Sequence, residues 1–475
     1  AQDPLPVWHG DLYLETHRGV WTSQRETKAG DARGDEALRE TETWCATAAV
    51  LTGSAYPYDE LDALWKRHLV LEFHDILPGS SITRVHREAE QEHAAILAET
   101  LVLRDSALRA LGAASAPREI AVASPSPVEE GAVLDNGLLR VRFDDRGRLV
   151  SLVDLRRGRE LVPPGAQLGG LQLHHDVPRW FDAWNIDREA MDAAEPVAGA
   201  LELGPDMVRV RYVFGGSSAT VAWRLPAHEA RLDAEVATEW HEDGRLLAMT
   251  WPLDLHAPHV TAGVQHGLVE RPLPARTSWE LARYEDWFQR YLHVAEGGFG
   301  VAVVTADAHG YGATSEPRDE GITTTLRTSL LRAPAYPDPT ADRGTHVQRL
   351  SLLVGADLDA ATRAGHAMRR ALVPGATDEV SVQPVADVSG PGVVVDAVKL
   401  ADDGSGDLVV RLHEALGARS VASLRAAVAL SAYALCDLLE RPDAIGWTPL
   451  DDGAHGLDLA LPPFALRTVR LRISR

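Results

Sequence analysis

Hydrophobic residues recur at helical intervals between residues 25 and 112. A first helix is expected to stop at Gly53, a second to have Asp59 as its N-cap, and a third to be capped by Ser80 or Ser81. The apolar stripe of the third helix is expected to comprise Ile82, Val85, Ala89, Ile96, Leu97, Leu101 and Leu108. Three helices joined by short turns predict a small bundle.

From about residue 117 the hydrophobic period changes to two. In "LLRVRFDDRGRLVSLVD" the apolar residues Leu139, Val141 and Phe143 alternate before an Asp-Asp-Arg-Gly turn, and the pattern resumes at Leu149, which indicates a β-hairpin. The same alternation continues in "MVRVRYVF", "ATVAWRL", "ARLDAEVATEW", "GFGVAVVT", "VQRLSLLV", "DLVVRLHEAL" and "LRTVRLRIS". Many short strands with few helices between them predict β-sandwich architecture.

The sequence therefore predicts a mainly β protein with an N-terminal α-helical part. We expect a three-helix middle domain at 25–116, a large antiparallel β-sandwich at 117–375 and a smaller C-terminal β domain at 376–475, with the last boundary near 370–384. A chain of 475 residues is too long for a single ordinary core, which agrees with several domains.

Composition restricts the possible partners. The formal net charge is -22, from 69 acidic and 47 basic residues, which disfavours nucleic acid and anionic lipid but not a neutral sugar. No window approaches the ~18 apolar residues of a membrane span, so we expect a soluble protein. The absence of signs of export leads us to expect a cytoplasmic location. The start "AQDPLPVW" has no methionine and no leader, which indicates a piece of a longer polypeptide. Two cysteines cannot build a disulfide framework.

The stretch "LVLEFHDILPGSSITRVHREA" places His74 and Asp75 together after an apolar helix. The pair is either a helix terminus with no further role or part of a reaction site. Zinc needs three or four protein ligands, and His68, six residues away, is not on the same helical face. If His74 binds a metal, the remaining ligands come from elsewhere in the fold.

A second candidate is "LHHDVPRWFDAWNID", where Trp180 and Trp184 alternate with Asp182 and Asp187. Aromatic faces beside carboxylates are typical of sugar sites, although a tryptophan-lined crevice between sheets explains the pattern equally well. His174, His175 and Asp176 could form a metal cluster, but we favour the interpretation that they point to opposite faces of a strand, as adjacent residues do.

Two further segments are of interest. "WHGDLYLETHRGVWTSQ", residues 8–24, is dense in aromatic and charged residues, which is typical of a site rim. "SLLRAPAYPDPTADRG", residues 329–344 and called the proline-rich loop below, is expected to be a fixed surface loop with little part in ligand binding. The sequence contains no GxSxG, P-loop, GxGxxG or kinase signature, so serine-nucleophile and phosphoryl chemistry are unsupported.

Five segments together resemble glycoside hydrolase family 38, the class II α-mannosidases, in its bacterial and cytosolic-type branch. They are "LPVWHGDLYLETHRGVWTSQ", "YPYDELDALWKRHLVLEFHDILPGSSITRVHREA", "DNGLLRVRFDDRGRLVSLVDLRRGREL", "RWFDAWNID" and "LLRAPAYPDPTADRGTH", in order along nearly the whole chain. The resemblance implies that the large domain is a galactose mutarotase-like supersandwich.

The resemblance also implies roles for individual residues. His74 would be a ligand of the catalytic zinc, and Asp75 would contact the sugar. The segment with Thr16, His17 and Arg18 would form the rim of the -1 subsite. Asp182 and Trp184 would lie on a loop of the large β domain that reaches the cleft. The substrates would be α-mannosides of glycans or glycoconjugates.

Members of this family are retaining glycosidases, which need a nucleophilic carboxylate and an acid/base carboxylate. The resemblance places both, with the other zinc ligands, in an N-terminal barrel before Ala1, and makes residues 1–24 the end of that barrel and a linker. We therefore assign no catalytic residue here and expect the chain to be inactive alone, with its own N-terminal catalytic domain as partner and homo-oligomers possible. The segment near 120–132 is shorter than the family pattern.

Two other hypotheses stay open on the sequence. The first is a non-catalytic carbohydrate-binding or scaffold protein of β-sandwich architecture. The second is an independent metallohydrolase, which requires His74, His174, His175 and Asp176 to converge.

Overall fold

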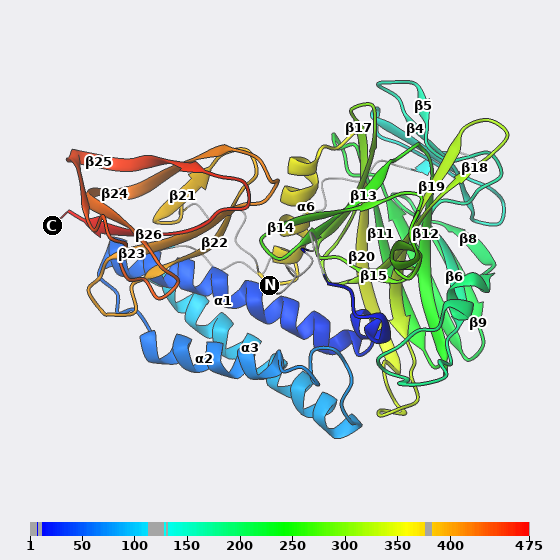
Figure 1. Ribbon diagram of the computed structural model, residues 1–475, viewed down its shortest axis with the longest axis horizontal. Helices are drawn as coiled ribbons and strands as arrows, with labels where there is room; N and C mark the ends of the chain where they lie inside the picture. The colour runs from blue at the N-terminus through cyan, green and yellow to red at the C-terminus, as the bar shows by residue number, and fades with distance from the viewer. Residues whose placement is uncertain (1–6, 8–11, 113–127, 130–131, 376–381, 475) are drawn as a thin grey trace, which may run out of the picture.

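The computed structural model describes residues 7, 12–112, 128–129, 132–375 and 382–474. In these residues an N-terminal helical part is followed by a large and a small antiparallel β part, so the predicted fold class is confirmed (Figure 1). The long helices are α1 (Arg25–Thr52), α2 (Tyr58–Leu71), α3 (Thr83–Ala110) and α6 (Leu358–Arg370). The short ones are η1 (Glu15–His17), η2 (Gly19–Trp21), α4 (Arg188–Asp192) and α5 (Ser278–Leu281). None of the described helices is both long and apolar enough to cross a membrane.

The ends of the first three helices agree only in part with the sequence pattern. Gly53 does end α1: its φ is 75°, and its backbone N–H donates a 3.1 Å hydrogen bond to the carbonyl oxygen of Ala49. The prediction that Asp59 is the N-cap of α2 is wrong, because the helix already begins at Tyr58 and Asp59 lies inside its first turn. The prediction that Ser80 or Ser81 caps α3 is also wrong, because that helix begins at Thr83 without a side-chain cap.

The buried face of α3 is more polar than the predicted stripe. Of the seven predicted apolar residues, Ala89, Ile96 and Leu108 are buried, whereas Ile82 is 51% exposed. The remainder of the buried face is Ala107 and four polar residues, His86, His93, Thr100 and Arg104. A hydrophobic pattern cannot register such residues, because their burial depends on partners in other helices.

The large β part contains three antiparallel sheets. The nine-stranded sheet has the order β14-β13-β16-β17-β20-β11-β10-β9-β8, the six-stranded sheet β15-β18-β19-β12-β6-β7, and the five-stranded sheet runs β1 to β5 in chain order. The first comprises β8 (Gly199–Leu203), β9 (Val208–Phe214), β10 (Ser217–Arg224), β11 (Arg231–Trp240), β13 (His259–Val264), β14 (Gly267–Pro272), β16 (Tyr291–Glu296), β17 (Phe299–Thr305) and β20 (Gly344–Val354). The second comprises β6 (Gly170–His175), β7 (Ala194–Pro196), β12 (Arg245–Asp254), β15 (Asp286–Trp287), β18 (Gly310–Pro317) and β19 (Ile322–Arg332). The third comprises β1 (Val128–Glu129), β2 (Val133–Asp135), β3 (Leu139–Phe143), β4 (Leu149–Asp154) and β5 (Arg159–Glu160).

One apolar core joins these three sheets. Strand β9 buries every second residue, as its sequence predicts, and the predicted hairpin is β3 paired with β4. The core includes Leu139 from β3, Trp223 from β10 and Trp251 from β12, and the two tryptophan rings meet edge to face at 6.1 Å. Burial of this shared core is what holds the sheets together.

The small β part is a six-stranded sheet in which β24 pairs with three neighbours. Its strands are β21 (Ala386–Ser389), β22 (Val393–Leu400), β23 (Leu408–Glu414), β24 (Ser420–Cys436), β25 (Thr448–Leu461) and β26 (Leu466–Ile473). The order is β21-β24-β26-β23-β22, with β25 paired to β24. Register shifts in the long β24 let the sheet fold around an apolar core that also contains Ala46 of α1.

Helix α1 connects the helical part to both β parts. Figure 1 shows it starting near the large β part and running beneath the small one. Its N-terminal Arg25 forms a buried ion pair of 2.6 Å with Asp307 of the large part, whereas Ala46 lies in the core of the small part. The two β parts are thus held by one rigid helix.

Candidate active-site half

The turn between α2 and α3 presents His74 to solvent. The His74 side chain is 75% exposed, and its Nε2 lies 3.5 Å from Oδ2 of Asp75. The hydroxyl of Ser80 donates a 3.3 Å hydrogen bond to Oδ1 of Asp75. An accessible imidazole therefore stands beside a carboxylate whose other oxygen is held in place.

The backbone of this turn is fixed against the start of α1. Gly79 has φ of 82°, and a Cβ atom there would lie 2.4 Å from the carbonyl oxygen of Ser23. Glycine is required at this position by both the conformation and the close approach. The Lys28 Nζ donates to the carbonyls of Ser23 at 2.5 Å and Leu77 at 2.9 Å. Burial lowers the pKa of Lys28 to about 7.

Two carboxylates of the proline-rich loop accept hydrogen bonds at the N-terminal ends of α1 and α3. Asp342 accepts hydrogen bonds from the backbone N–H groups of Gln24 at 3.0 Å and Arg25 at 2.6 Å, at the start of α1. Asp338 accepts a 2.6 Å bond from the hydroxyl of Thr83, at the start of α3. Carboxylates stabilise helix N-termini, so this loop orders the elements on both sides of the His74 turn.

Arg332, at the end of β19, is the fully buried centre of the same region. Its Nε lies 2.5 Å from Oδ2 of Asp176, which is also fully buried. Its remaining hydrogen bonds, of 2.5 to 3.0 Å, go to the hydroxyl of Ser23 and to the carbonyl oxygens of Asp182, Ala183 and Asn185. One guanidinium thus holds residues 176–187, the loop of Trp180 and Trp184 that is called the Trp-rich loop below, against the residues that precede α1.

The three neighbouring residues that resembled a metal cluster do not form one. His174 is buried with Nδ1 donating to the carbonyl of Ala190 at 2.9 Å, His175 is exposed, and Asp176 is buried against Arg332. The prediction that strand alternation separates them is confirmed. The metallohydrolase hypothesis is wrong, because within the described ranges no converging group of three or more ligands contains these residues or His74.

Arg18 and His17 differ in their accessibility. The Arg18 side chain is buried, donates to the carbonyl of Ala282 at 3.0 and 3.3 Å, and lies 4.3 Å from the ring centroid of Tyr284. His17 is half-buried, with Nδ1 3.2 Å from the hydroxyl of Thr16. Arg18 is therefore committed to protein partners, whereas His17 retains access to solvent.

Asp182 and Trp184 also hold the region together. The carbonyl of Trp184 accepts a 2.7 Å bond from the N–H of Gly19. The Asp182 carboxylate accepts backbone bonds from Ala335 at 2.6 Å and Tyr336 at 3.0 Å. The structure thus brings the His17–Arg18 segment and the Trp-rich loop into contact, and Ser23 links both to the His74 turn.

Three exposed aromatic side chains line this region, and two of them were not singled out from the sequence. Trp180 is 69% exposed, Phe181 63% and Tyr336 67%. The backbone carbonyl of Tyr336 accepts a 3.0 Å hydrogen bond from the N–H of Ala183, which holds the two loops together. We call these three residues the aromatic rim. Sequence reasoning selected Trp180 with Trp184, yet Trp184 is half-buried. The available signal for Phe181 and Tyr336 was an aromatic residue in a loop bounded by proline.

Three family models match this chain, each over a different part. The Alpha mannosidase middle domain matches residues 15–111, the Glycosyl hydrolases family 38 C-terminal domain matches 134–340, and the Glycosyl hydrolases family 38 C-terminal beta sandwich domain matches 392–469. The matches follow one another in the order of the helical, large β and small β parts.

Curated relatives and solved structures agree with these matches. Alpha-mannosidase 2C1 of Homo sapiens is 30% identical over 99% of this chain and 51% of its own length, and Alpha-mannosidase of Saccharomyces cerevisiae is 24% identical over 98% and 49%. The chain thus spans about half the length of these relatives. An alpha-mannosidase from Enterococcus faecalis V583 shares the fold, with a TM-score of 0.75 at 14% identity over 95% of this chain and 68% of that one. The chain belongs to glycoside hydrolase family 38, of which it carries the middle and C-terminal domains.

Proposed function

We propose that this chain works in a zinc-dependent, retaining, exo-acting α-mannosidase, as one side of the catalytic cleft. The observation that carries the proposal is the exposed His74 imidazole on a turn whose backbone is fixed from two sides. A functional ligand must be both accessible and pre-positioned, and a helix terminus without a role needs neither. Family membership supports the same conclusion.

The donor atoms of this turn fit part of a zinc site. Imidazole nitrogen and carboxylate oxygen are both zinc ligands, and a catalytic site uses three protein ligands. Within the part of the chain that the structure describes, His74 joins no group of three converging ligands. We therefore place the remaining ligands on an N-terminal catalytic domain that docks against the His74 turn.

The chemical roles follow from the retaining mechanism, which needs two carboxylates about 5–5.5 Å apart. We place both on the N-terminal domain. Zinc, when bound, would polarise and orient the sugar hydroxyls. Asp75, held by Ser80, would accept a hydrogen bond from a hydroxyl of the mannose, and His17 would lie at the rim of that subsite. Arg18, Asp182 and Trp184 act as positioning residues for the aromatic rim, on which a pyranose face can pack.

The first test is hydrolysis of an aryl α-mannoside by the purified 475-residue chain with added zinc or cobalt, beside the product of the complete reading frame. We expect turnover only from the complete product. Activity of the 475-residue chain alone would contradict the placement of the nucleophile, and the carboxylates near Trp184 would then be the first to substitute. A complete product that binds mannosides without hydrolysing them would favour the scaffold hypothesis.

A second test assigns the roles of the two site residues in the complete product. His74→Asn is expected to lower both zinc content and kcat/KM, the latter by roughly 100-fold or more, since loss of even an indirect metal contact costs up to that factor. Asp75→Asn is expected to retain zinc and lose a similar factor in kcat/KM. His175→Gln is the control, because His175 is an exposed histidine outside the region. Wild-type zinc content and activity in His74→Asn would refute the assignment.

A further inference from the structure

A cluster of possible metal ligands lies between α1 and α2, apart from the His74–Asp75 pair. His68 and Glu72 are one helical turn apart at the end of α2, and Asp31 faces them from α1. The Nε2 of His68 lies 3.5 Å from Oδ1 of Asp31 and 3.6 Å from Oε1 of Glu72. All three ligand atoms lie within 4.8 Å of one another.

These separations suit a bound cation better than direct hydrogen bonds. An N–H···O bond joins its heavy atoms at about 2.7–3.2 Å, so both contacts of His68 are too long. Ligand atoms held at about 2.1 Å from a tetrahedral ion lie roughly 3.4 Å apart. The geometry is therefore close to that of three ligands with an ion between them.

The polar atoms of this cluster lack partners of their own. The His68 side chain is fully buried, and neither of its ring nitrogens has a hydrogen-bond partner among the described residues. Oδ1 of Asp31 has none there either. Buried polar groups in native proteins are almost always satisfied, so unpartnered atoms that face one another indicate a missing ligand.

The helix backbone is shaped to admit the imidazole of His68. Gly34 lies within α1, where glycine is unfavourable, and a Cβ atom there would lie 2.9 Å from Nδ1 of His68. The absence of a side chain lets the ring lie directly on the helix. The room for the His68 ring therefore comes from the glycine at position 34 of α1.

The two carboxylates of the cluster differ from the neighbouring acidic residues of α1 in their ion pairs. Of the other acidic residues on this part of α1, Asp35 lies 2.9 Å from Arg39 and 3.6 Å from Arg369, and Glu36 lies 3.7 Å from Arg369. In the described part of the chain, no lysine or arginine lies within 4 Å of the Asp31 or Glu72 carboxylate, and both form ion pairs only with His68. Burial raises the pKa of Asp31, while Arg369, Lys28 and Arg39 act on it from a greater distance and lower that pKa. Two carboxylates and one imidazole match the charge and ligand preference of a divalent transition metal.

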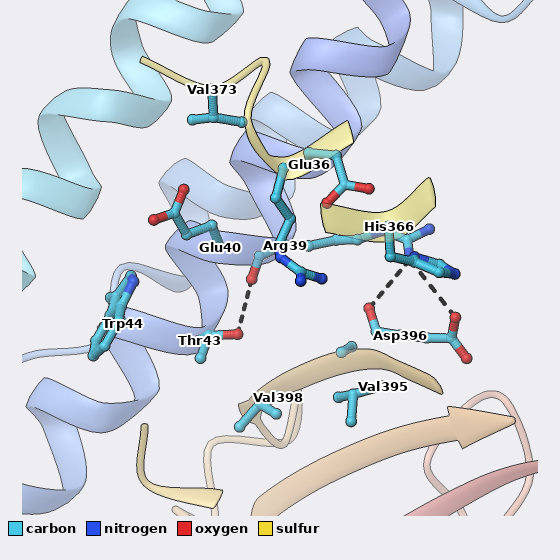
Figure 2. A pocket seen from close by; sticks show the side chains of 12 residues that line it. Glu36, Arg39, Glu40, Thr43, Trp44, His366, Val373, Val395, Asp396 and Val398 are labelled. Atoms are coloured by element: carbon cyan, nitrogen blue, oxygen red, sulfur yellow. Dashed lines mark hydrogen bonds and ion pairs between the residues drawn. The ribbon is translucent and has the colours of Figure 1, made fainter. Parts of the chain in front are cut away.

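A second group of possible ligands, His266, Asp396 and His413, lacks these features. His413 Nδ1 lies 2.8 Å from the Asp396 carboxylate, so both atoms are already satisfied. Figure 2 shows Arg39 of α1 bound to Asp396 at the edge of a cavity of about 220 Å³. The Arg39 Nη1 lies 3.7 Å from Oδ1 of Asp396 and supplies the positive charge that a metal would bring.

We infer that Asp31, His68 and Glu72 form a binding site for a zinc-type divalent ion that joins α1 to the end of α2. The Glu72 side chain is 42% exposed, so the site opens to solvent on that side, where water can complete the coordination. Glu72 directly precedes the turn that carries His74. An ion at this site therefore fixes the point from which that turn begins. The site does not depend on the proposed enzymatic activity.

The test measures metal binding by the 475-residue chain itself. The chain is stripped with a chelator, dialysed, and titrated with zinc by calorimetry and with cobalt by visible absorption. We expect one ion per chain and a rise in the melting temperature on zinc addition. Glu72→Gln, which alters a partly exposed side chain and leaves the core intact, is expected to weaken binding by at least about tenfold and to remove that rise. His68→Asn is expected to do the same.

Three matched variants separate this site from the alternatives. His74→Asn, His413→Asn and His93→Asn are all expected to retain the ion. His93 is the closest control, because it is also buried and neither of its ring nitrogens has a hydrogen-bond partner among the described residues. Its ring lies 6.0 Å from that of His68. If the wild-type chain binds no metal ion, the inference is overturned. Binding that survives Glu72→Gln but is lost in any of the three controls overturns it as well.

Discussion

The Nζ atom of Lys28 lies 2.9 Å from the carbonyl oxygen of Leu77, so a buried lysine of α1 holds the turn that carries His74. The same atom binds the carbonyl of Ser23, whose hydroxyl contacts Arg332 of the large β part at 3.0 Å. Three parts of the chain that are far apart in sequence are thereby joined through one short series of polar contacts. The turn that carries His74 is therefore held by contacts from outside the helix pair as well as by α2, from which it continues.

Replacing Lys28 by methionine is expected to loosen the His74 turn. Two buried carbonyls would lose their donor, which costs about 1–3 kcal/mol. Amide hydrogen exchange should show the effect at Leu77 and Gly79, whose N–H groups bond within the turn. Exchange there is expected to accelerate roughly tenfold or more. Lys66→Met is the control, since Lys66 is 73% exposed on α2. Unchanged exchange at both amides in Lys28→Met would contradict this role.

The buried pair of Arg332 and Asp176 gives a second prediction. Arg332→Met leaves a fully buried carboxylate unpaired, which is expected to lower the free energy of unfolding by about 3–5 kcal/mol. Adding Asp176→Asn should restore part of that loss, because the uncompensated charge is removed. The measurement is urea unfolding of the single and double variants. Arg343→Met, which breaks a more exposed pair with Asp243, should cost less than about 1 kcal/mol.

An equal loss in the single and double variants would show that the guanidinium acts through its carbonyl contacts alone. The partners of Arg332 on the Trp-rich loop would then account for the whole effect.

The local elements of this protein were readable from the sequence, because they depend on neighbouring residues. Alternation along β9 and the hairpin of β3 and β4 follow from the period of two. The same rule predicted that His174 and His175 lie on opposite faces, and it is confirmed. Periodicity reports which face is buried without reference to the rest of the fold.

The site was readable only in part, because its supports come from remote segments. Asp342 caps α1 from more than 300 residues away, and Arg332 lies 156 positions from Asp176. Neither contact has a local signal. The wrong cap of α3 has the same origin, since Thr83 at the start of that helix binds Asp338 of the proline-rich loop. His74 and Asp75 were singled out from their place after an apolar helix, whereas the roles assigned to them come from the resemblance and remain predictions.

Gly34 offers a test of the space left for His68. Alanine is normally better than glycine in a helix by about 1 kcal/mol, yet Gly34→Ala is expected to destabilise by about 1–3 kcal/mol because its Cβ would crowd Nδ1 of His68. In a His68→Ala background the same change should become stabilising. A double-mutant cycle by thermal or urea unfolding measures this coupling. Equal effects of Gly34→Ala in both backgrounds would contradict the close approach.

His174 gives a prediction for the pH dependence of stability. Burial lowers its pKa from 6.5 to about 4, with Arg327 acting in the same direction. Between these values the unfolded chain binds a proton that the folded chain does not. The stability from the neutral His174 is therefore fully present above pH 6.5 and is lost as the pH falls toward 4, by on the order of 3 kcal/mol.

His174→Gln is accordingly expected to flatten the acid limb of the stability profile by up to one proton, about 1.4 kcal/mol per pH unit. Urea unfolding between pH 4.5 and 7, with a fluorescence signal from the buried tryptophans of the large β core, measures the slope. The adjacent His175→Gln is the matched control, because that side chain is exposed on the opposite face of β6 and should leave the slope unchanged. If both variants kept the wild-type slope, another buried group would be responsible for the acid sensitivity, and the neutral state of His174 would contribute nothing to it.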